Sequence, residues 1–226
     1  MIQPKKAPVI DGDLRKHMIR LPESLQECSG IQIFGRTIRS IVFSTDIAII
    51  RNCNADAVIA VYPFTPQPAI THAIISAADI PVFCGVGGGT TRGKRVINLA
   101  MDAEFQGALG VVLNAPTENE ILAEVSRRLD IPVVITVASE ATDIDARIQA
   151  GAEIINVSGA AATPAIVRSI RKKYPDFPII ATGGPNEDTI RETIQAGANA
   201  ITYTPATNGE IFKELMVKYR QNPENG

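Results

Sequence analysis

Two short phrases that alternate along the chain constrain its fold more than any other feature of the sequence. The first is Asp-Ile-Pro-Val or Asp-Phe-Pro-Ile, and it opens an apolar run rich in β-branched residues at 79–82, 130–133 and 176–179. Proline is tolerated at the first residue of a strand, because its missing N–H costs little there. The second is Gly-Ala after an amphipathic segment, where glycine commonly ends a helix, at 107–108, 151–152 and 197–198. The chain is therefore predicted to alternate between strands and helices.

Eight apolar runs fit this alternation, and each is followed by a helical pattern. They are nearly continuous, as expected of parallel strands that are buried on both faces. Regular recurrence favours a closed barrel over an open doubly wound sheet, and 226 residues suit one such domain. We predict an α/β protein with a single (βα)8 TIM barrel over residues 38–226 and a short N-terminal extension over 1–37. The predicted strands are 38–45, 57–64, 81–88, 108–115, 132–139, 153–159, 178–184 and 200–205.

Local signals predict where some of these helices begin and place a short strand in the N-terminal extension. Thr117 and Glu120 have the spacing of a capping box for a helix over 117–129. Thr163 is predicted as the N-cap of a helix over 163–174, with Pro164 in its first turn. Residues 31–34 form a short extra strand that either plugs the amino-terminal end of the barrel or joins a subunit interface, and the sequence leaves both open.

Composition excludes several classes of partner. A net charge of −2 provides no basic field for nucleic acid or an anionic membrane. No apolar run approaches the roughly 18 residues of a membrane span, and the first residues lack the apolar core of a signal peptide. The 3 cysteines have no metal-like spacing and fit a reducing compartment. We expect a cytoplasmic protein without nucleic-acid or membrane partners, and leave a homo-oligomer open.

Function in a barrel of this kind is expected on the loops that follow the carboxyl ends of the strands. These positions are mostly small, polar and uncharged, which suits hydrogen bonding to a ligand better than strong acid–base chemistry. The residues predicted to contact the ligand are Ser44, Asn114, Asn156 and Arg92.

The stretch 181–190, Ala-Thr-Gly-Gly-Pro-Asn-Glu-Asp-Thr-Ile, resembles the seventh βα unit of the ribulose-phosphate-binding barrels. Relatives in that group include thiamine-phosphate synthase, the N-acylglucosamine-6-phosphate epimerases and the inosine-monophosphate dehydrogenase group. The resemblance implies a phosphate held by backbone N–H groups after strands seven and eight, at Gly183, Gly184 and Thr204. Glycine lets the backbone approach an anion, and Gly159 is included for that reason. The opposing interpretation is that the Gly183-Gly184 pair is only a tight turn.

A second glycine-rich segment, 85–95, contains the G-x-x-x-x-G-K spacing of a P-loop at 88–94. Arg95 stands where a P-loop has the Ser or Thr that holds Mg²⁺, so we interpret the match as false. The segment is either a mobile cationic loop, in which Arg92 and Lys94 close over an anionic ligand, or a solvated flexible loop.

Few titratable residues are available for catalysis. The candidates are Asp46 and Glu140 as proton carriers and Lys94 as the cation of the closing loop. Asp46 could equally cap the helix that follows it, and Glu140 could serve the dipole of the next helix. Cys84 is expected in the core, and His72 on a helix surface. No metal site and no cofactor is predicted.

Two functions remain open. The first is an isomerase, epimerase or lyase that acts on a small phosphorylated metabolite at the carboxyl-terminal rim. The second is a non-catalytic sensor or regulatory barrel for such a metabolite. A hydrolase is a weaker third option, because no nucleophile triad is visible.

Overall fold

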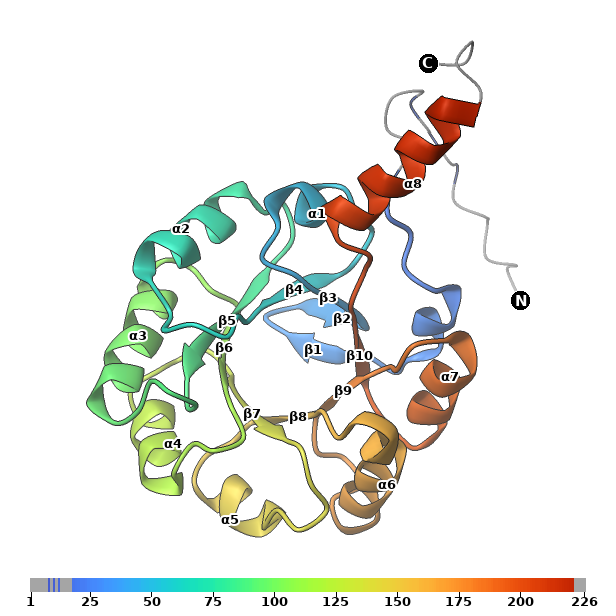
Figure 1. Ribbon diagram of the computed structural model, residues 1–226. Helices are drawn as coiled ribbons and strands as arrows, with labels where there is room; N and C mark the ends of the chain where they lie inside the picture. Colours follow the sequence, from blue (N-terminus) through green and yellow to red (C-terminus); the bar gives the residue numbers. More distant parts are fainter. Residues whose placement is uncertain (1–7, 9, 11, 13–17, 222–226) are drawn as a thin grey trace.

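A closed barrel of eight parallel strands forms the centre of the molecule (Figure 1). This computed structural model describes residues 8, 10, 12 and 18–221, so most of the first 17 residues of the expected extension lie outside the described part. Each strand pairs with its neighbour in sequence, and β10 closes the circle against β3. The strands are β3 (Ser40–Phe43), β4 (Ala57–Ala60), β5 (Val82–Gly87), β6 (Gly110–Leu113), β7 (Val133–Val137), β8 (Ile154–Val157), β9 (Ile179–Thr182) and β10 (Ala200–Tyr203). The predicted α/β barrel is confirmed.

A helix follows every barrel strand, as the alternating phrases predicted. Helices α1 to α7 surround the barrel (Figure 1). The helices are α1 (Ile47–Arg51), α2 (Pro68–Ala77), α3 (Lys94–Phe105), α4 (Asn119–Ser126), α5 (Ile144–Gln149), α6 (Thr163–Lys173), α7 (Glu187–Gln195) and α8 (Asn208–Gln221).

Two predicted helix starts are wrong in detail. Helix α4 begins at Asn119 without a side-chain cap, because the Thr117 hydroxyl instead donates to the Asn114 carbonyl at 2.7 Å. Helix α6 begins at Thr163 itself, since a 3₁₀ turn over Ala160–Ala162 precedes it, and the Thr163 hydroxyl accepts the Gly159 N–H at 3.0 Å. Both threonines are used to fix the loop before the helix rather than its first turn.

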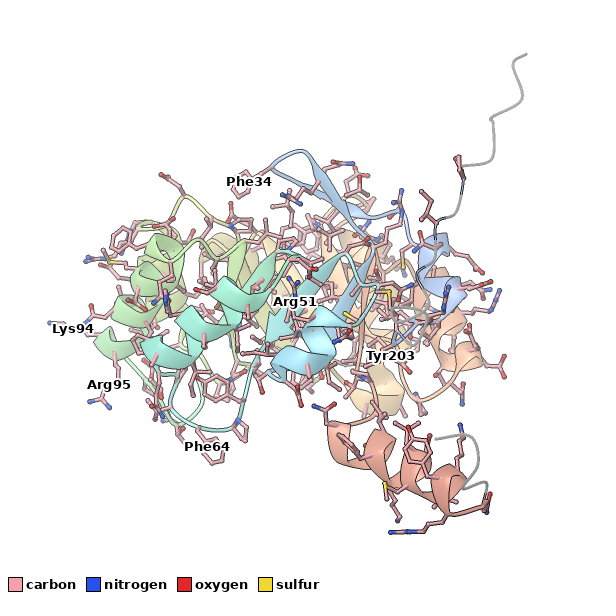
Figure 2. The ribbon with its side chains drawn as sticks, turned by 90° about the horizontal axis from the view of Figure 1, so that it is seen from above. Phe34, Arg51, Phe64, Lys94, Arg95 and Tyr203 are labelled. Atoms are coloured by element: carbon pink, nitrogen blue, oxygen red, sulfur yellow. The ribbon has the colours of Figure 1, made fainter. Side chains whose placement is uncertain are left out.

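A hairpin plugs the amino-terminal end of the barrel. Strands β1 (Ile31–Ile33) and β2 (Arg36–Ile38) pair antiparallel, and Ile31, Ile33 and Ile38 are buried in the same cluster as the inward-facing barrel residues. Figure 2 shows Phe34, at the tip of the hairpin, on the opposite side of the barrel from Phe64, which follows β4. The predicted strand 38–45 is therefore divided: Ile38 ends the plug, and the barrel strand starts at Ser40.

The described residues of the N-terminal extension that precede the hairpin pack against the outside of the barrel. Leu21, Leu25 and Cys28 are buried in the outer core, and the 3₁₀ helix η1 (Glu23–Glu27) lies beside α7. Helix α8 projects away from the barrel and has no buried residue (Figures 1 and 2). None of the described helices combines the length and apolar character that crossing a membrane requires.

Candidate functional site

The barrel interior changes from apolar to polar along its axis. Ile154 and Ala200 belong to the buried inner cluster. Because side chains alternate along a strand, the residues two positions further on, Asn156 and Thr202, also face inward at the carboxyl-terminal end. The side-chain amide of Asn156 donates to Thr136 on β7 at 3.2 Å. The mouth of the barrel is thus lined by uncharged hydrogen-bonding groups.

Two polar atoms in this mouth have no partner among the described residues. Asn156 Oδ1 and Thr202 Oγ1 are buried and make no hydrogen bond. A buried polar group without a partner costs about 1–3 kcal/mol, so such groups usually have a water or a ligand as partner. Each of these two atoms could therefore take a hydrogen bond from a bound water or ligand.

A cavity of about 180 Å³ opens on one side of the mouth. The loop after β4 forms one wall, the glycine-rich loop after β5 forms another, and Asn114, after β6, completes the lining. We call this cavity the glycine-loop pocket. Its lining carries no charged side chain and consists of Val61, Tyr62, Pro63, Phe64, Pro66, Gly85, Gly87, Gly89, Thr90, Thr91 and Asn114.

A second cavity, of about 270 Å³, lies between the end of β3 and the end of β10. It shares Val61 with the glycine-loop pocket and is lined by Ser44, Asp46 and Thr204 among others. Asp46 is the N-cap of α1, where its Oδ1 accepts the N–H groups of Ala48 at 2.9 Å and Ile49 at 3.3 Å. Three predicted site residues are therefore brought together here, and the cap interpretation of Asp46 is confirmed.

The predicted phosphate cradle at Gly183 and Gly184 has a clear structural role. A Cβ on Gly183 would lie 2.7 Å from Ile201 Cγ2 and 2.8 Å from Ile190 Cγ1, so the glycine permits α7 to pack closely on the strands. Gly184 has a φ of +82°, a conformation that favours glycine. The two glycines thus fit the interpretation of a tight turn.

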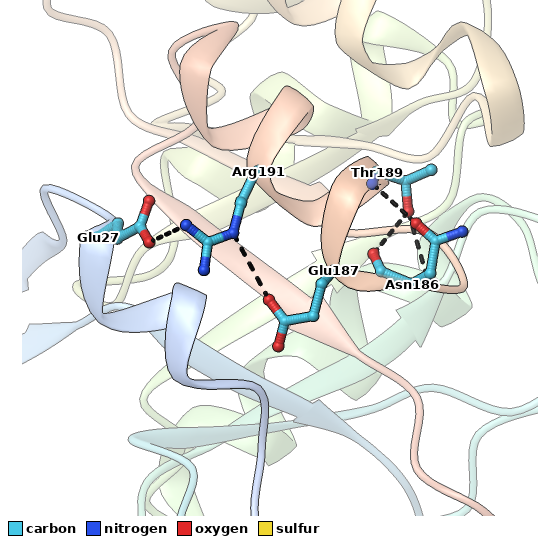
Figure 3. Close-up of polar contacts among 5 residues, drawn as sticks. All are labelled: Glu27, Asn186, Glu187, Thr189 and Arg191. Atoms are coloured by element: carbon cyan, nitrogen blue, oxygen red, sulfur yellow. Dashed lines mark hydrogen bonds and ion pairs between the residues drawn. The ribbon is translucent and has the colours of Figure 1, made fainter.

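The N-terminus of α7, next to this turn, is occupied by its own side chains (Figure 3). The Asn186 side chain accepts the Thr189 N–H at 3.0 Å, and Thr189 Oγ1 accepts the Asn186 N–H at 3.3 Å. Glu187 and Asp188 stand in the first turn, and Arg191 pairs with Glu27 at 2.7 Å. A phosphate here would meet two carboxylates, while the nearby guanidinium already has a partner.

Gly159 lies at the start of the β8–α6 loop, where the local backbone is strained. Ala160, which follows it, has a φ of +51°, an uncommon conformation for a residue with a Cβ. The first turn of α6 carries no acidic residue. Of the two glycine turns predicted to hold phosphate, the one at Gly159 has fewer carboxylates beside it.

The cations of the glycine-rich segment do not line the mouth. Figure 2 shows Lys94 and Arg95 at the outer edge of the molecule, directed away from the barrel. Arg92 is exposed, and its Nε donates to the Gly89 carbonyl at 3.0 Å. Lys94 and Arg92 therefore lie apart from Asp46 in this conformation.

Glu140 also lies away from both mouth cavities. It lines a surface hollow of about 240 Å³ together with Asp143 and Asp145 of the α5 region and Lys173 and Tyr174 at the end of α6. The predicted pair of proton carriers, Asp46 and Glu140, thus lines two separate cavities.

Two other residues are placed as the sequence predicted. Cys84 is buried in β5, and burial raises the pKa of its thiol to about 12. His72 is exposed on α2, where its nearest polar partner is Ser76 at 3.5 Å.

Sequence reasoning missed the inward-facing threonines Thr136 and Thr202 and gave no role to Tyr62. The signal that finds the threonines is the alternation along each strand, counted from an apolar inward residue such as Val134 or Ala200. No sequence signal singles out Tyr62, because the cavity depends on how two loops face each other.

The part of the chain that the structure describes contains no group of three or more His, Cys, Asp or Glu residues arranged to hold a metal ion. Asp46 lines the second cavity, and neither mouth cavity has another carboxylate in its lining. The second oxygen of Asp46, Oδ2, accepts from the Asn208 side chain at 2.6 Å. Mg²⁺ sites in proteins use one or two carboxylates that are free to coordinate. The residues at the mouth do not fit such a site.

Comparison with known proteins shows the fold and no closer relationship. No family model and no curated protein matches the sequence. Solved structures do: 2,3-dimethylmalate lyase, a PEP mutase/isocitrate lyase superfamily member, has a TM-score of 0.64 at 14% identity over 94% of this chain and 88% of its own. A Burkholderia cenocepacia J2315 protein assigned as a phosphonomutase gives 0.63 at 18% identity over 80% and 92%.

A third similar structure is phosphonopyruvate hydrolase in complex with oxalate and Mg²⁺, with a TM-score of 0.59 at 14% identity over 81% of this chain and 82% of that one. None of these three structures is described as a ribulose-phosphate-binding barrel, so the comparisons support the barrel fold and not the resemblance of residues 181–190 to that group. In this barrel the Gly183-Gly184 turn permits close packing of α7 on the strands. At these identities the likeness shows that the chain is a (βα)8 barrel similar to PEP mutase/isocitrate lyase superfamily structures.

Proposed function

We propose that this chain is an enzyme of the lyase or mutase type that acts on a small metabolite with an oxyanion group, phosphorylated or carboxylated, in the mouth of its barrel. The observation that carries the proposal is the pair of buried, unpartnered atoms, Asn156 Oδ1 and Thr202 Oγ1. They lie at the carboxyl ends of strands, where barrel enzymes bind their substrates. Similar folds bear names of mutases, lyases and hydrolases, which supports the reaction class.

The proposed roles follow from placement. Asn156, Thr202 and Thr136 orient the polar body of the metabolite by hydrogen bonds. Asp46 is the proton carrier, because it lines the second cavity and the glycine-loop pocket has no carboxylate in its lining. Lys94 and Glu140 receive no catalytic role, since neither lines these cavities.

The test is a turnover screen of the full chain. Panels of small phosphorylated and carboxylated metabolites are incubated with the protein and followed by ¹H and ³¹P NMR for bond cleavage or group migration. We expect one class to be converted, and Asp46→Asn to lower its kcat by about 10² or more, as loss of an acid–base group does. Glu140→Gln is the matched carboxylate-to-amide control and should leave kcat unchanged. Conversion at an equal rate by Asp46→Asn would reject the assignment of the proton carrier.

A second candidate function is a metabolite-binding regulatory barrel. It is favoured by the scarcity of titratable side chains in the mouth, where Asp46 is committed to capping α1. Tight binding of a panel member, with no product after prolonged incubation, would support this function over the enzyme.

A further inference from the structure

The glycine-loop pocket carries unused hydrogen-bond donors. The loop after β5 is shaped by Gly87 and Gly88, whose φ values are +126° and +96°, and by the hydrogen bond from Gly88 N–H to the Thr91 carbonyl at 2.9 Å. Among the described residues, nothing accepts a hydrogen bond from the N–H groups of Gly89 and Thr90, and both residues line the cavity. Backbone N–H groups in such a turn form a concavity that binds anions.

The shape of this loop is fixed by its packing. A Cβ on Gly88 would lie 1.9 Å from Thr117 Oγ1, so only glycine fits at that point. Thr91 is buried, and its hydroxyl donates to Thr65 of the facing loop at 3.2 Å. The amides of the loop are therefore preorganised in the structure as it stands.

Two side chains add donors to the same cavity. Tyr62 OH accepts the Gln67 N–H at 2.9 Å, which leaves its own proton free to donate. Asn114 makes no recorded side-chain hydrogen bond in the described residues, and a Cβ on Gly89 would lie 3.6 Å from its Nδ2. The pocket thus offers backbone, phenol and amide donors, with no carboxylate in its lining to repel an anion.

We infer that the glycine-loop pocket binds an oxyanion group of the metabolite through these neutral donors and without a divalent cation. The inference rests on the proposed function and assigns the anion of that metabolite to one side of the mouth. Phosphonopyruvate hydrolase, a similar fold, holds oxalate together with Mg²⁺. In this chain neutral donors take the place of the metal, since the pocket has no carboxylate and Asp46, in the adjoining cavity, has both oxygens engaged.

The size of the pocket limits what enters it. A volume of about 180 Å³ corresponds to roughly six water molecules at about 30 Å³ each. An inorganic phosphate or a carboxylate of two or three carbons fits this space. The wall of Pro63, Phe64 and Pro66 provides apolar contact for the carbon atoms of a larger metabolite.

The experiment is isothermal titration calorimetry of the full chain with oxalate and, separately, with inorganic phosphate. Each titration is done in EDTA and again in excess MgCl₂. We expect at least one anion to bind with the same affinity in both buffers. Tyr62→Phe and Asn114→Asp should each weaken binding about tenfold or more, as loss of a hydrogen bond to a charged group does.

The matched controls are Tyr219→Phe on α8 and Asn98→Asp on the exposed side of α3, and both should bind as the wild type does. Thermal unfolding of each variant verifies its fold. If Asn114→Asp does not fold, the affinity of Tyr62→Phe alone tests whether the pocket binds the anion. Binding that requires Mg²⁺, binding of neither anion, or wild-type affinity in Tyr62→Phe would overturn the inference. Metal-independent binding without turnover of any panel member would reject the enzyme and retain the pocket. Turnover of a panel member at a rate that Tyr62→Phe leaves unchanged would reject the pocket and retain the enzyme.

Discussion

Asp46 and Asn208 join the first and last helices of the barrel: Asn208 Nδ2 donates to Asp46 Oδ2 at 2.6 Å. The contact lies beside the seam where β10 pairs with β3 and the barrel closes. Asp46 therefore caps α1, anchors the start of α8 and lines a mouth cavity at the same time. Its structural and chemical roles have to be separated by experiment.

Two substitutions of Asp46 separate them. Asparagine caps helices as well as aspartate does, so Asp46→Asn should change the free energy of unfolding by less than about 1 kcal/mol while it removes the carboxylate. Asp46→Ala should cost about 0.5–2 kcal/mol, because the Ala48 and Ile49 N–H groups lose their acceptor. Urea denaturation measures both. Equal stability of Asp46→Ala and the wild type would show that the cap contributes nothing.

Arg171 on α6 holds the loops at the amino-terminal end of the barrel. Its guanidinium donates to the carbonyls of Pro175 at 2.6 Å, Phe177 at 2.9 Å and Gly197 at 2.7 Å, and to Asn199 Oδ1 at 2.8 Å. Arg171→Met should lower the free energy of unfolding by about 2–4 kcal/mol, because several half-buried acceptors are left unpaired. Chemical denaturation followed by circular dichroism provides the measurement.

Arg168, one turn earlier on α6, is the matched control. It makes an ion pair with Glu192 at 2.8 Å, and both side chains are more than half exposed. Surface ion pairs contribute about 0–1 kcal/mol, so Arg168→Met should unfold almost as the wild type does. Comparable losses in the two variants would mean that the helix, rather than the loop carbonyls, is sensitive to substitution.

The barrel was predictable because its signals are local and repeated. Proline at the start of a strand and glycine after a helix alternate from β5 to β10, so six weak signals support one another. The boundary between the plug and the barrel was harder to predict, because Ile38 at the end of β2 and the residues of β3 form one largely apolar run. The hairpin turn at Phe34-Gly35 separates β1 from β2 and does not mark this boundary. The predicted caps at Thr117 and Thr163 were wrong because a threonine hydroxyl can hydrogen-bond the backbone of the preceding loop as easily as the first turn of a helix.

The site was only partly predictable, because it depends on which way loops turn after their strands. Ser44, Asp46 and Thr204 line one mouth cavity as a consequence of β3 and β10 being neighbours, which the closed barrel itself requires. Glu140 follows the end of β7 by three residues, as Asp46 follows the end of β3, yet Glu140 lines neither mouth cavity. Lys94, seven residues after the end of β5, also lines neither of them. No local pattern in the sequence predicts which residues near a strand end line a mouth cavity.

Phe34 is an unfavourable residue for its turn. It has a φ of +46°, followed by Gly35 at +78°, so both central residues of the hairpin loop have positive φ. Asn-Gly is the preferred pair in such a loop, whereas a bulky residue is strained there. Phe34 is 66% exposed, so little packing is lost on its removal. Phe34→Asn should raise the free energy of unfolding by about 0.5–1 kcal/mol in urea titrations. A decrease would show that the Phe34 side chain makes a stabilising contact.

Buried thiols predict how stability depends on alkaline pH. Burial raises the pKa of Cys28 and of Cys84 to about 12, and also raises that of Cys53. An exposed thiol in the unfolded chain has a pKa of about 8.5. Below that pH both states are protonated, and the thiols add no pH dependence. Between about pH 9 and 12 only the unfolded state loses the protons of Cys28 and Cys84, so the free energy of unfolding falls by about 1.4 kcal/mol per pH unit for each of these two thiols.

Cys84→Ala tests this dependence, because it removes one thiol from β5 and leaves the other titrating groups in place. Its free energy of unfolding should be lower than that of the wild type at pH 7, owing to the lost side-chain packing. The difference in free energy of unfolding between the two proteins should shrink as pH rises through 9 to 11, since only the wild type has the Cys84 thiol, which stays protonated in the folded state and ionises in the unfolded state. Guanidinium denaturation at intervals across this range measures the two slopes. Parallel curves would mean that the Cys84 thiol ionises as readily in the folded barrel as in the unfolded chain, which would contradict its burial in the strand.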